Sequence, residues 1–156
     1  MIYRFLFYTL IGVLVIGCSS SSDEETELIP ISFVGIAMDF NSLEIESSKR
    51  LTVVTNQEEF QQEWLRLSVE QAPLIDFESL NVVIAEMGTQ SGTGVAQIIV
   101  ESVAEGIDHT KVNVTTFLPG AGCTEDAALS TPFHVVSVES KNTFLFSERL
   151  DTVNCN

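Results

Sequence analysis

Histidine, cysteine and basic residues are all scarce in this sequence of 156 residues. The only two histidines, His109 and His134, have no further ligand at a usable spacing, so we expect neither a metal site nor a cofactor. Seven Lys and Arg residues stand against 22 Asp and Glu residues, which gives a formal net charge of −15. Because phosphates are bound through basic side chains, this charge argues against nucleic acid and against anionic lipid head groups as partners.

Long apolar runs are also scarce in the sequence, and the one that stands out extends from Phe5 to Ile16. About a dozen apolar residues are too few for a comfortable membrane span, and the preceding Arg4 gives the run the form of a signal-peptide core. The run ends in Val15-Ile16-Gly17-Cys18, which resembles a bacterial lipobox. A plain secretory signal or a short core helix are the alternatives. We expect residues 1–17 to be removed, and Cys18 to be acylated, for example with palmitate, as a membrane anchor.

Residues 18–30 form an acidic, serine-rich linker, in which four serines precede the run from Asp23 to Glu27. Such a segment cannot bury apolar area and is expected to stay disordered. It serves either as a self-repelling spacer or as a sorting signal. Ser19 is compatible with the outer membrane of a bacterial envelope, on its periplasmic or surface face. Residues 31–156 then form one domain of ordinary length.

The domain is expected to contain seven strands and one early amphipathic helix. The helix begins near Asn56, and either Thr55 or Asn56 can act as its cap. Phe60, Trp64 and Leu67 form an apolar stripe before Pro73 closes the segment. The strands are expected at Ile31–Phe40, Arg50–Thr55, Asn81–Met87, Val95–Val103, Lys111–Leu118, Pro132–Val138 and Thr143–Arg149. Their hairpin spacing predicts an α+β fold with a mostly antiparallel β-sheet, either a curved sheet or a sandwich.

The two cysteines outside the lipobox, Cys123 and Cys155, are natural disulfide partners in an oxidising compartment. Cys123 lies in a glycine-rich loop, and Cys155 follows the last expected strand. The alternative is two unpaired or buried thiols. We expect the disulfide to close a loop of about thirty residues and to stabilise the domain by roughly 3–4 kcal/mol in the chain-entropy model.

No combination of residues stands out as catalytic. A nucleophile and its base need a Ser or Cys, a His and an acid close together, and Ser and acidic residues are too frequent here for spacing to select any. His109 is expected in a solvated turn beside Asp108, and His134 is expected as a packed or hydrogen-bonded core residue. The Gly88–Gly94 turn joins two strands and lacks the Lys-Ser/Thr of a phosphate-binding loop. We therefore expect no enzyme activity.

Several short motifs, in their order and spacing, resemble the C-terminal domain of the PrcB family. They are Pro73, Asp76-Phe77, Val82-Val83-Ile84, Met87-Gly88, Ser91-Gly92-Thr93-Gly94, Pro119-Gly120-Ala121-Gly122-Cys123 and Thr131–Val136. The resemblance covers roughly Leu51 to Phe146. Gly92-Thr93-Gly94-Val95 departs from the family's usual glycine pair and following aromatic. The resemblance implies a non-catalytic, accessory lipoprotein of a surface protease complex, and it names no substrate.

Two hypotheses of function follow. In the first, the domain is an interaction module that binds a protein partner through its two glycine-rich loops. In the second, the same loops form the rim of a pocket in a small-ligand-binding protein or a hydrolytic enzyme. The residues expected to form the partner-binding loops are Gly88, Thr89, Gln90, Gly92, Gly94, Pro119, Gly120, Ala121 and Gly122.

We predict that Cys18→Ala will release the domain from membranes or leave an uncleaved precursor, because the thiol is the group that takes the lipid. Detergent phase partitioning and the intact mass of the chain measure both outcomes. Unchanged partitioning together with an unchanged mass would contradict the lipoprotein interpretation.

Overall fold

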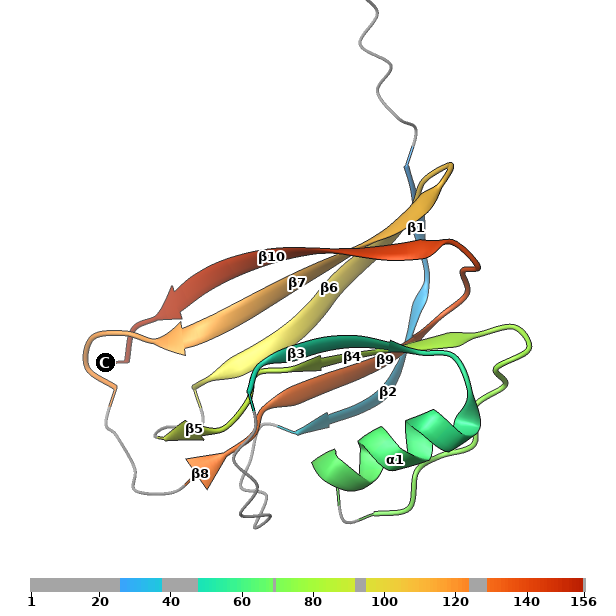
Figure 1. The fold of residues 1–156 in the computed structure, drawn as a ribbon. Coiled ribbons are helices and arrows are strands. Elements are labelled where there is room, and N and C mark those ends of the chain that lie inside the picture. Colours follow the sequence, from blue (N-terminus) through green and yellow to red (C-terminus); the bar gives the residue numbers. More distant parts are fainter. Residues whose placement is uncertain (1–25, 38–47, 69, 92–94, 124–128, 156) are drawn as a thin grey trace, which may run out of the picture.

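The computed structural model describes residues 26–37, 48–68, 70–91, 95–123 and 129–155, and strands predominate in these ranges. They form two four-stranded sheets and one two-stranded sheet, and one helix lies beside them (Figure 1). This content agrees with the predicted α+β class with mostly antiparallel strands and an early helix. The elements are β1 (Glu27–Ile29), β2 (Ile31–Ala37), β3 (Arg50–Val54), α1 (Gln57–Leu67), β4 (Asn81–Glu86), β5 (Gln90–Ser91), β6 (Gln97–Glu105), β7 (His109–Pro119), β8 (Leu129–Ser130), β9 (Phe133–Val138) and β10 (Thr143–Val153).

The first four-stranded sheet, sheet A, has the order β1-β6-β7-β10 and contains a parallel pair. Strand β6 pairs antiparallel with β1 and β7, whereas β10 runs parallel to β7 along its whole length. From the sequence, the segments of β9 and β10 are predicted to be consecutive strands at hairpin spacing. In the structure they lie in different sheets, so the short connection between them crosses between the sheets instead of forming a hairpin.

The second four-stranded sheet, sheet B, has the order β2-β9-β4-β3 and is antiparallel throughout. Its central strands, β4 and β9, are buried at every position. On one face, Val83, Ala85 and Met87 belong to a core shared with β6 and β7 of sheet A. On the other face, Val82 and Ile84 belong to a core shared with α1. Burial of both faces explains why these strands are continuously apolar and do not alternate.

Helix α1 has the cap and the buried face that the sequence predicts. The side chain of Asn56 accepts a hydrogen bond from the Glu59 N–H at 2.9 Å, which satisfies one of the free donors of the first turn. Phe60, Trp64 and Leu67 are the buried residues of the helix, and they pack against sheet B. The helix ends at Leu67, well before Pro73, because Ser68 already has an extended backbone.

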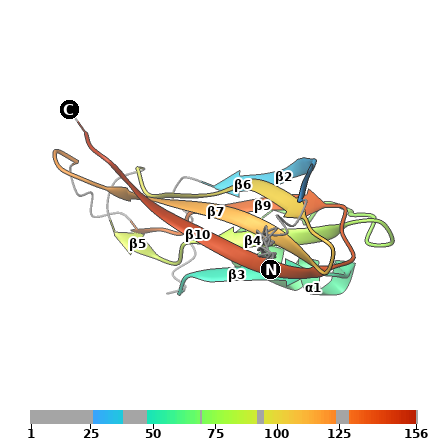
Figure 2. The ribbon, with the colours of Figure 1, turned by 90° about the horizontal axis from the view of Figure 1, so that it is seen from above.

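The folded part begins before Ile31. Residues 27–29, within the segment assigned from the sequence to the linker, form β1 on the edge of sheet A, and β2 then enters sheet B after Pro30. The chain therefore joins the two sheets along one side. Along the other side, Lys49 lies just before β3 and makes an ion pair with Glu148 of β10, and it also donates to the Thr116 hydroxyl at 3.0 Å. Figure 2 shows β3 and β10 on this same side of the molecule.

The sequence analysis placed other boundaries within a few residues. His109, expected in a turn, is the first residue of β7, and β6 and β10 extend past their expected ends. The short strands β5 and β8 were not expected, since two-residue strands leave no periodic pattern. Residues 38–40, expected as the end of the first strand, lie outside the described ranges.

We predict that Gly35→Ala lowers the free energy of unfolding by about 1–3 kcal/mol, the usual cost of overpacking. A Cβ atom at Gly35, next to the irregularity in the β2–β9 register, would lie 2.5 Å from Cη2 of Trp64. Urea titration measures the change. The matched control is the same substitution in a Trp64→Leu background, where the ring is gone. An equal loss in both backgrounds would show that the ring is not the cause.

Candidate functional site

The loop after β7 is joined to the segment after β10 by a disulfide. As predicted, Cys123 and Cys155 pair, with Cα atoms 4.8 Å apart. Backbone bonds reinforce the junction: the Gly120 N–H donates to the Val153 carbonyl at 2.8 Å, and the Cys155 N–H donates to the Ala121 carbonyl at 3.0 Å. The 119–123 loop is therefore fixed to residues 153–155 by two backbone hydrogen bonds and by the disulfide.

The glycines of this loop are explained by that junction. A Cβ atom at Gly120 would collide with the side chains of Asn154 and Thr152, and one at Gly122 would collide with the Cys155 carbonyl oxygen. Gly122 also has φ +82°, a conformation that side chains disfavour. From the sequence, these glycines are predicted to lie in a partner-binding loop. In the structure, their small size makes room for contacts within the chain. Pro119 and Ala121 remain exposed beside them.

The second glycine-rich segment leads from β4 into β5. Gly88 is buried and has φ +79°, and the Gln90 side chain donates to the carbonyls of Met87 at 3.3 Å and Gly88 at 3.4 Å. Thr89, between Gly88 and Gln90, is half-buried, and strand β5 then pairs with β8. Gly92 and Gly94 lie outside the described ranges, as does Cys18.

Both loops lie at the same end of the molecule. In Figures 1 and 2, the end of β7, β5 and the C-terminal segment all lie toward the left. Strand β1 lies toward the opposite end, because Glu27 pairs with Glu105, the last residue of β6. The nine residues of β6 span about 30 Å at the usual rise of a strand. The loop end is thus separated from the start of β1 by the length of the sheet.

His134 is a structural residue between the two sheets. Its Nδ1 atom accepts a hydrogen bond from the Val100 N–H at 2.9 Å, at the point where β6 is irregular. Burial lowers the pKa of this histidine, which favours the neutral imidazole with its proton on Nε2. The imidazole thus supplies the acceptor for a β6 amide, and the sequence-based expectation of a hydrogen-bonded core histidine is confirmed.

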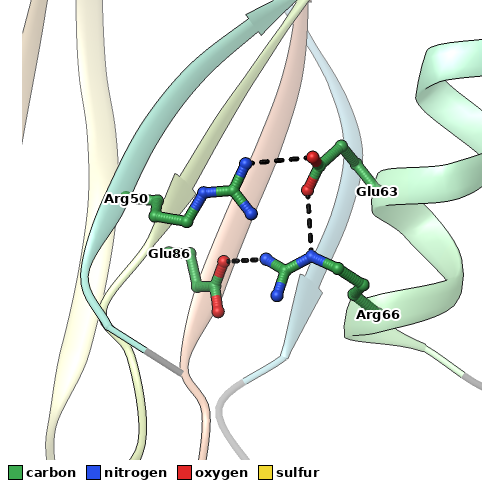
Figure 3. Close-up of polar contacts among 4 residues, drawn as sticks. All are labelled: Arg50, Glu63, Arg66 and Glu86. Atoms are coloured by element: carbon green, nitrogen blue, oxygen red, sulfur yellow. Dashed lines mark hydrogen bonds and ion pairs between the residues drawn. The ribbon is translucent and has the colours of Figure 1, made fainter. Parts of the chain in front are cut away.

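A charged network that the sequence analysis did not identify links α1 to sheet B (Figure 3). The carboxylate of Glu86 lies on the helix-facing side of β4 with only 1% of its side chain exposed, and its Oε2 atom accepts from the Arg66 guanidinium at 2.6 Å. Arg66 also contacts Glu63 at 3.1 Å, and Glu63 contacts Arg50 at 3.0 Å. Within the described part of the chain, Glu86 Oε1 is the buried side-chain atom without a hydrogen bond.

Two opposing effects act on the charges of this network. Burial raises the pKa of Glu63, but hydrogen bonds and charges from Arg50 and Arg66 outweigh it, so the pKa lies below its ordinary value. Burial lowers the pKa of Arg66, but Glu63 and Glu86 outweigh it and the pKa is raised. Both residues therefore stay charged, which is needed because an unpaired carboxylate at Glu86 would be costly. The feature of the sequence that could have indicated this network is an acidic residue, Glu86, within the otherwise apolar run 82–87.

The outer face of sheet A carries a polar depression of about 280 Å³. Arg149 crosses it and contacts Glu101 at 3.0 Å and the Thr115 hydroxyl at 3.3 Å, and Asn113 donates to Ser102 at 2.9 Å. Most of the polar side chains that line the depression are therefore hydrogen-bonded to one another. The depression is not the pocket expected at the glycine-rich loops, which lie at the end of the sheet.

The described ranges contain no group of three or more His, Cys, Asp or Glu side chains arranged to hold a metal ion. Among the same residues, no helix has the length and apolarity needed to cross a bilayer. Comparison of the chain with protein-family models, curated proteins and solved structures finds no match.

We predict that Arg66→Met lowers the free energy of unfolding by about 3 kcal/mol, since it leaves the Glu86 carboxylate buried without its partner. Chemical denaturation measures the loss. Replacing both residues, Arg66→Met with Glu86→Leu, is expected to recover most of it, because apolar pairs often substitute well for buried ion pairs. Arg149→Met is the control at an exposed ion pair, with an expected cost below about 1 kcal/mol. No recovery in the double variant would contradict this explanation.

Proposed function

We propose that this chain is a lipid-anchored protein of the bacterial cell envelope whose β domain is a non-catalytic module for binding a protein partner. The observation that carries the proposal is the position of the two loops. They lie together at the end of the molecule that is farthest from the start of β1, and one of them is held by the Cys123–Cys155 disulfide. Loops held on a rigid scaffold are where binding is concentrated.

The lipobox and the position of β1 support the orientation that this function needs. An anchor at Cys18 would be connected to β1 by a linker of a few residues, at the end of sheet A where β6 meets β7. The loop end would then point away from the membrane, and its distance from the start of β1 would be about the length of β6. In this orientation the loops are accessible to a partner in the compartment beyond the bilayer.

The disulfide supports an extracytoplasmic location, because disulfides persist in oxidising compartments. The resemblance to the PrcB family suggests a secreted or surface protease as the partner. The formal charge of −15 favours a partner that presents basic or neutral groups at the contact. Catalysis by His134 is disfavoured, since its Nδ1 atom is engaged by β6.

The second candidate is a small-ligand-binding protein or a hydrolytic enzyme. The observation in its favour is the polar depression on sheet A, which has hydroxyl, amide, carboxylate and guanidinium groups on one surface. Its mutual hydrogen bonds would have to be exchanged for bonds to a ligand. Because this costs the bonds already made, we rank this candidate second.

We predict that Ala121→Arg reduces partner capture at least about tenfold, because it adds a bulky charge at an exposed position of the disulfide-held loop. The tagged full chain is purified from native membranes, and the co-purifying proteins are quantified by mass spectrometry. Ile107→Arg is the matched control: it adds the same charge at an exposed residue of the β6–β7 turn, at the opposite end, and is expected to leave capture unchanged.

The histidine variants His109→Asn and His134→Asn are measured in parallel for capture and for hydrolytic activity. If Ala121→Arg keeps full capture while a histidine variant loses a measurable activity, the interaction-module proposal fails and the second candidate takes its place.

A further inference from the structure

The free edge of β10 is the longest regular edge in the described part of the molecule. The strand has eleven residues, contains no proline, and pairs with β7 without a register shift. No strand of the described ranges pairs with its other side. In Figure 2, β10 runs diagonally across the view, from the lower right to the C-terminus at the upper left. A long edge of this kind presents unpaired backbone groups and can accept another strand.

The hydrogen bonds at the end of β10 identify which backbone groups face outward. The Val153 carbonyl and the Cys155 N–H both bond to the loop after β7, so the odd-numbered residues direct their backbone groups toward β7. Because backbone groups alternate along a strand, the even-numbered residues direct theirs to the free edge. In agreement, the Thr152 N–H is bonded to the side chain of Asp151 at 2.8 Å and not to β7.

The side chains near the middle of this edge form a self-complementary pattern. Arg149 lies on the outer face of sheet A, where it contacts Glu101, and the alternation of the strand places Asp151 on the same face. Between them, Leu150 is 66% exposed. A positive residue, an apolar residue and a negative residue therefore follow one another on an open edge.

We infer that β10 is an interface for a second copy of this chain, paired antiparallel across a two-fold axis at Leu150. In this register Leu150 lies opposite its own copy, and each Arg149 lies opposite the Asp151 of the other chain, which gives two reciprocal ion pairs. Opposite charges facing each other across strands stabilise a sheet, and like charges destabilise it. The carboxylate that now bonds to the Thr152 N–H would turn to Arg149 of the second copy.

The neighbouring registers are less favourable for the same reason. A two-fold axis at Glu148 would place two carboxylates opposite each other, and an axis at Arg149 would place two guanidinium groups opposite each other. An axis at Ser147 would bring no opposite charges together. A two-fold axis between two residues would place an odd-numbered residue opposite an even-numbered one. Their side chains lie on opposite faces of the sheet, so an antiparallel pair cannot form in that register. The pairing at Leu150 is the register that satisfies both charge and symmetry.

This inference does not depend on the proposed function. The second copy would use the free side of β10, whereas the 119–123 loop bonds to the side of this strand that faces β7. The result would be a continuous eight-stranded sheet made of two copies of sheet A.

The test measures self-association of the full chain in detergent, with micelles in large excess over protein, by sedimentation equilibrium. Arg149→Asp and Asp151→Arg each place like charges opposite each other, and each is expected to raise the dimer dissociation constant at least about tenfold. Combining Arg149→Asp with Asp151→Arg exchanges the charges and is expected to restore dimerisation to within about threefold. Because the double variant still lacks the contact between Arg149 and Glu101, a merely local effect would not be restored in this way.

Cross-linking tests the register directly. In Leu150→Cys the two thiols would lie opposite each other at a distance that a disulfide can bridge, so mild oxidation is expected to produce a covalent dimer. Ser147→Cys is the control on the same strand, and its thiols would lie several residues apart. A chain that stays monomeric up to about millimolar concentration overturns the inference, as does cross-linking of Ser147→Cys as fast as Leu150→Cys.

Discussion

The fold depends on the burial of β4 and β9 on both of their faces. These two central strands of sheet B lie between α1 and sheet A, and every residue in them is buried. Removal of this apolar area from water is the main stabilising term available to the domain. It also limits where polar groups can be placed, because a buried polar group needs a partner. Glu86 and His134 lie on opposite faces of these strands, and each has its partner on the neighbouring layer.

Several of the connections between the two sheets differ in their chemistry. The chain crosses between them at Pro30, Lys49 and Glu148 form an ion pair on the other side, and the connection from β9 to β10 joins them again. Burial lowers the pKa of Lys49, so this ion pair is made at some cost in desolvation. The disulfide then holds the loop after β7 against the segment after β10.

These connections leave three distinct surfaces for function. The start of β1 lies toward one end of sheet A, the two loops lie toward the other end, and the free edge of β10 is the side of that strand that faces away from β7. An anchor, a partner and a second copy would each use a different surface. The proposed activities are therefore compatible with one another in one molecule, since none requires the others to be displaced.

Much of the local structure could be predicted from the sequence, because it depends on interactions between residues that are near in the chain. The helix, with its cap at Asn56 and its stripe Phe60, Trp64 and Leu67, and most of the strands are of this kind. The pairing of Cys123 with Cys155 was also predictable, since these are the two cysteines outside the expected lipobox, and a lipobox predicts an oxidising compartment. The resemblance of residues 15–18 to a lipobox likewise rests on adjacent residues alone.

The sequence by itself thus determined the class of the fold, its helix and its disulfide, together with the expected membrane anchor. Only the tertiary structure decided that β10 runs parallel to β7, that Arg66 neutralises Glu86, and that the loop glycines make room for the chain's own C-terminal segment. Each of these depends on residues distant in the chain. A strand's periodicity shows which face is buried but carries no information on which strand lies beside it, so pairing and charge partners emerge only when the layers pack.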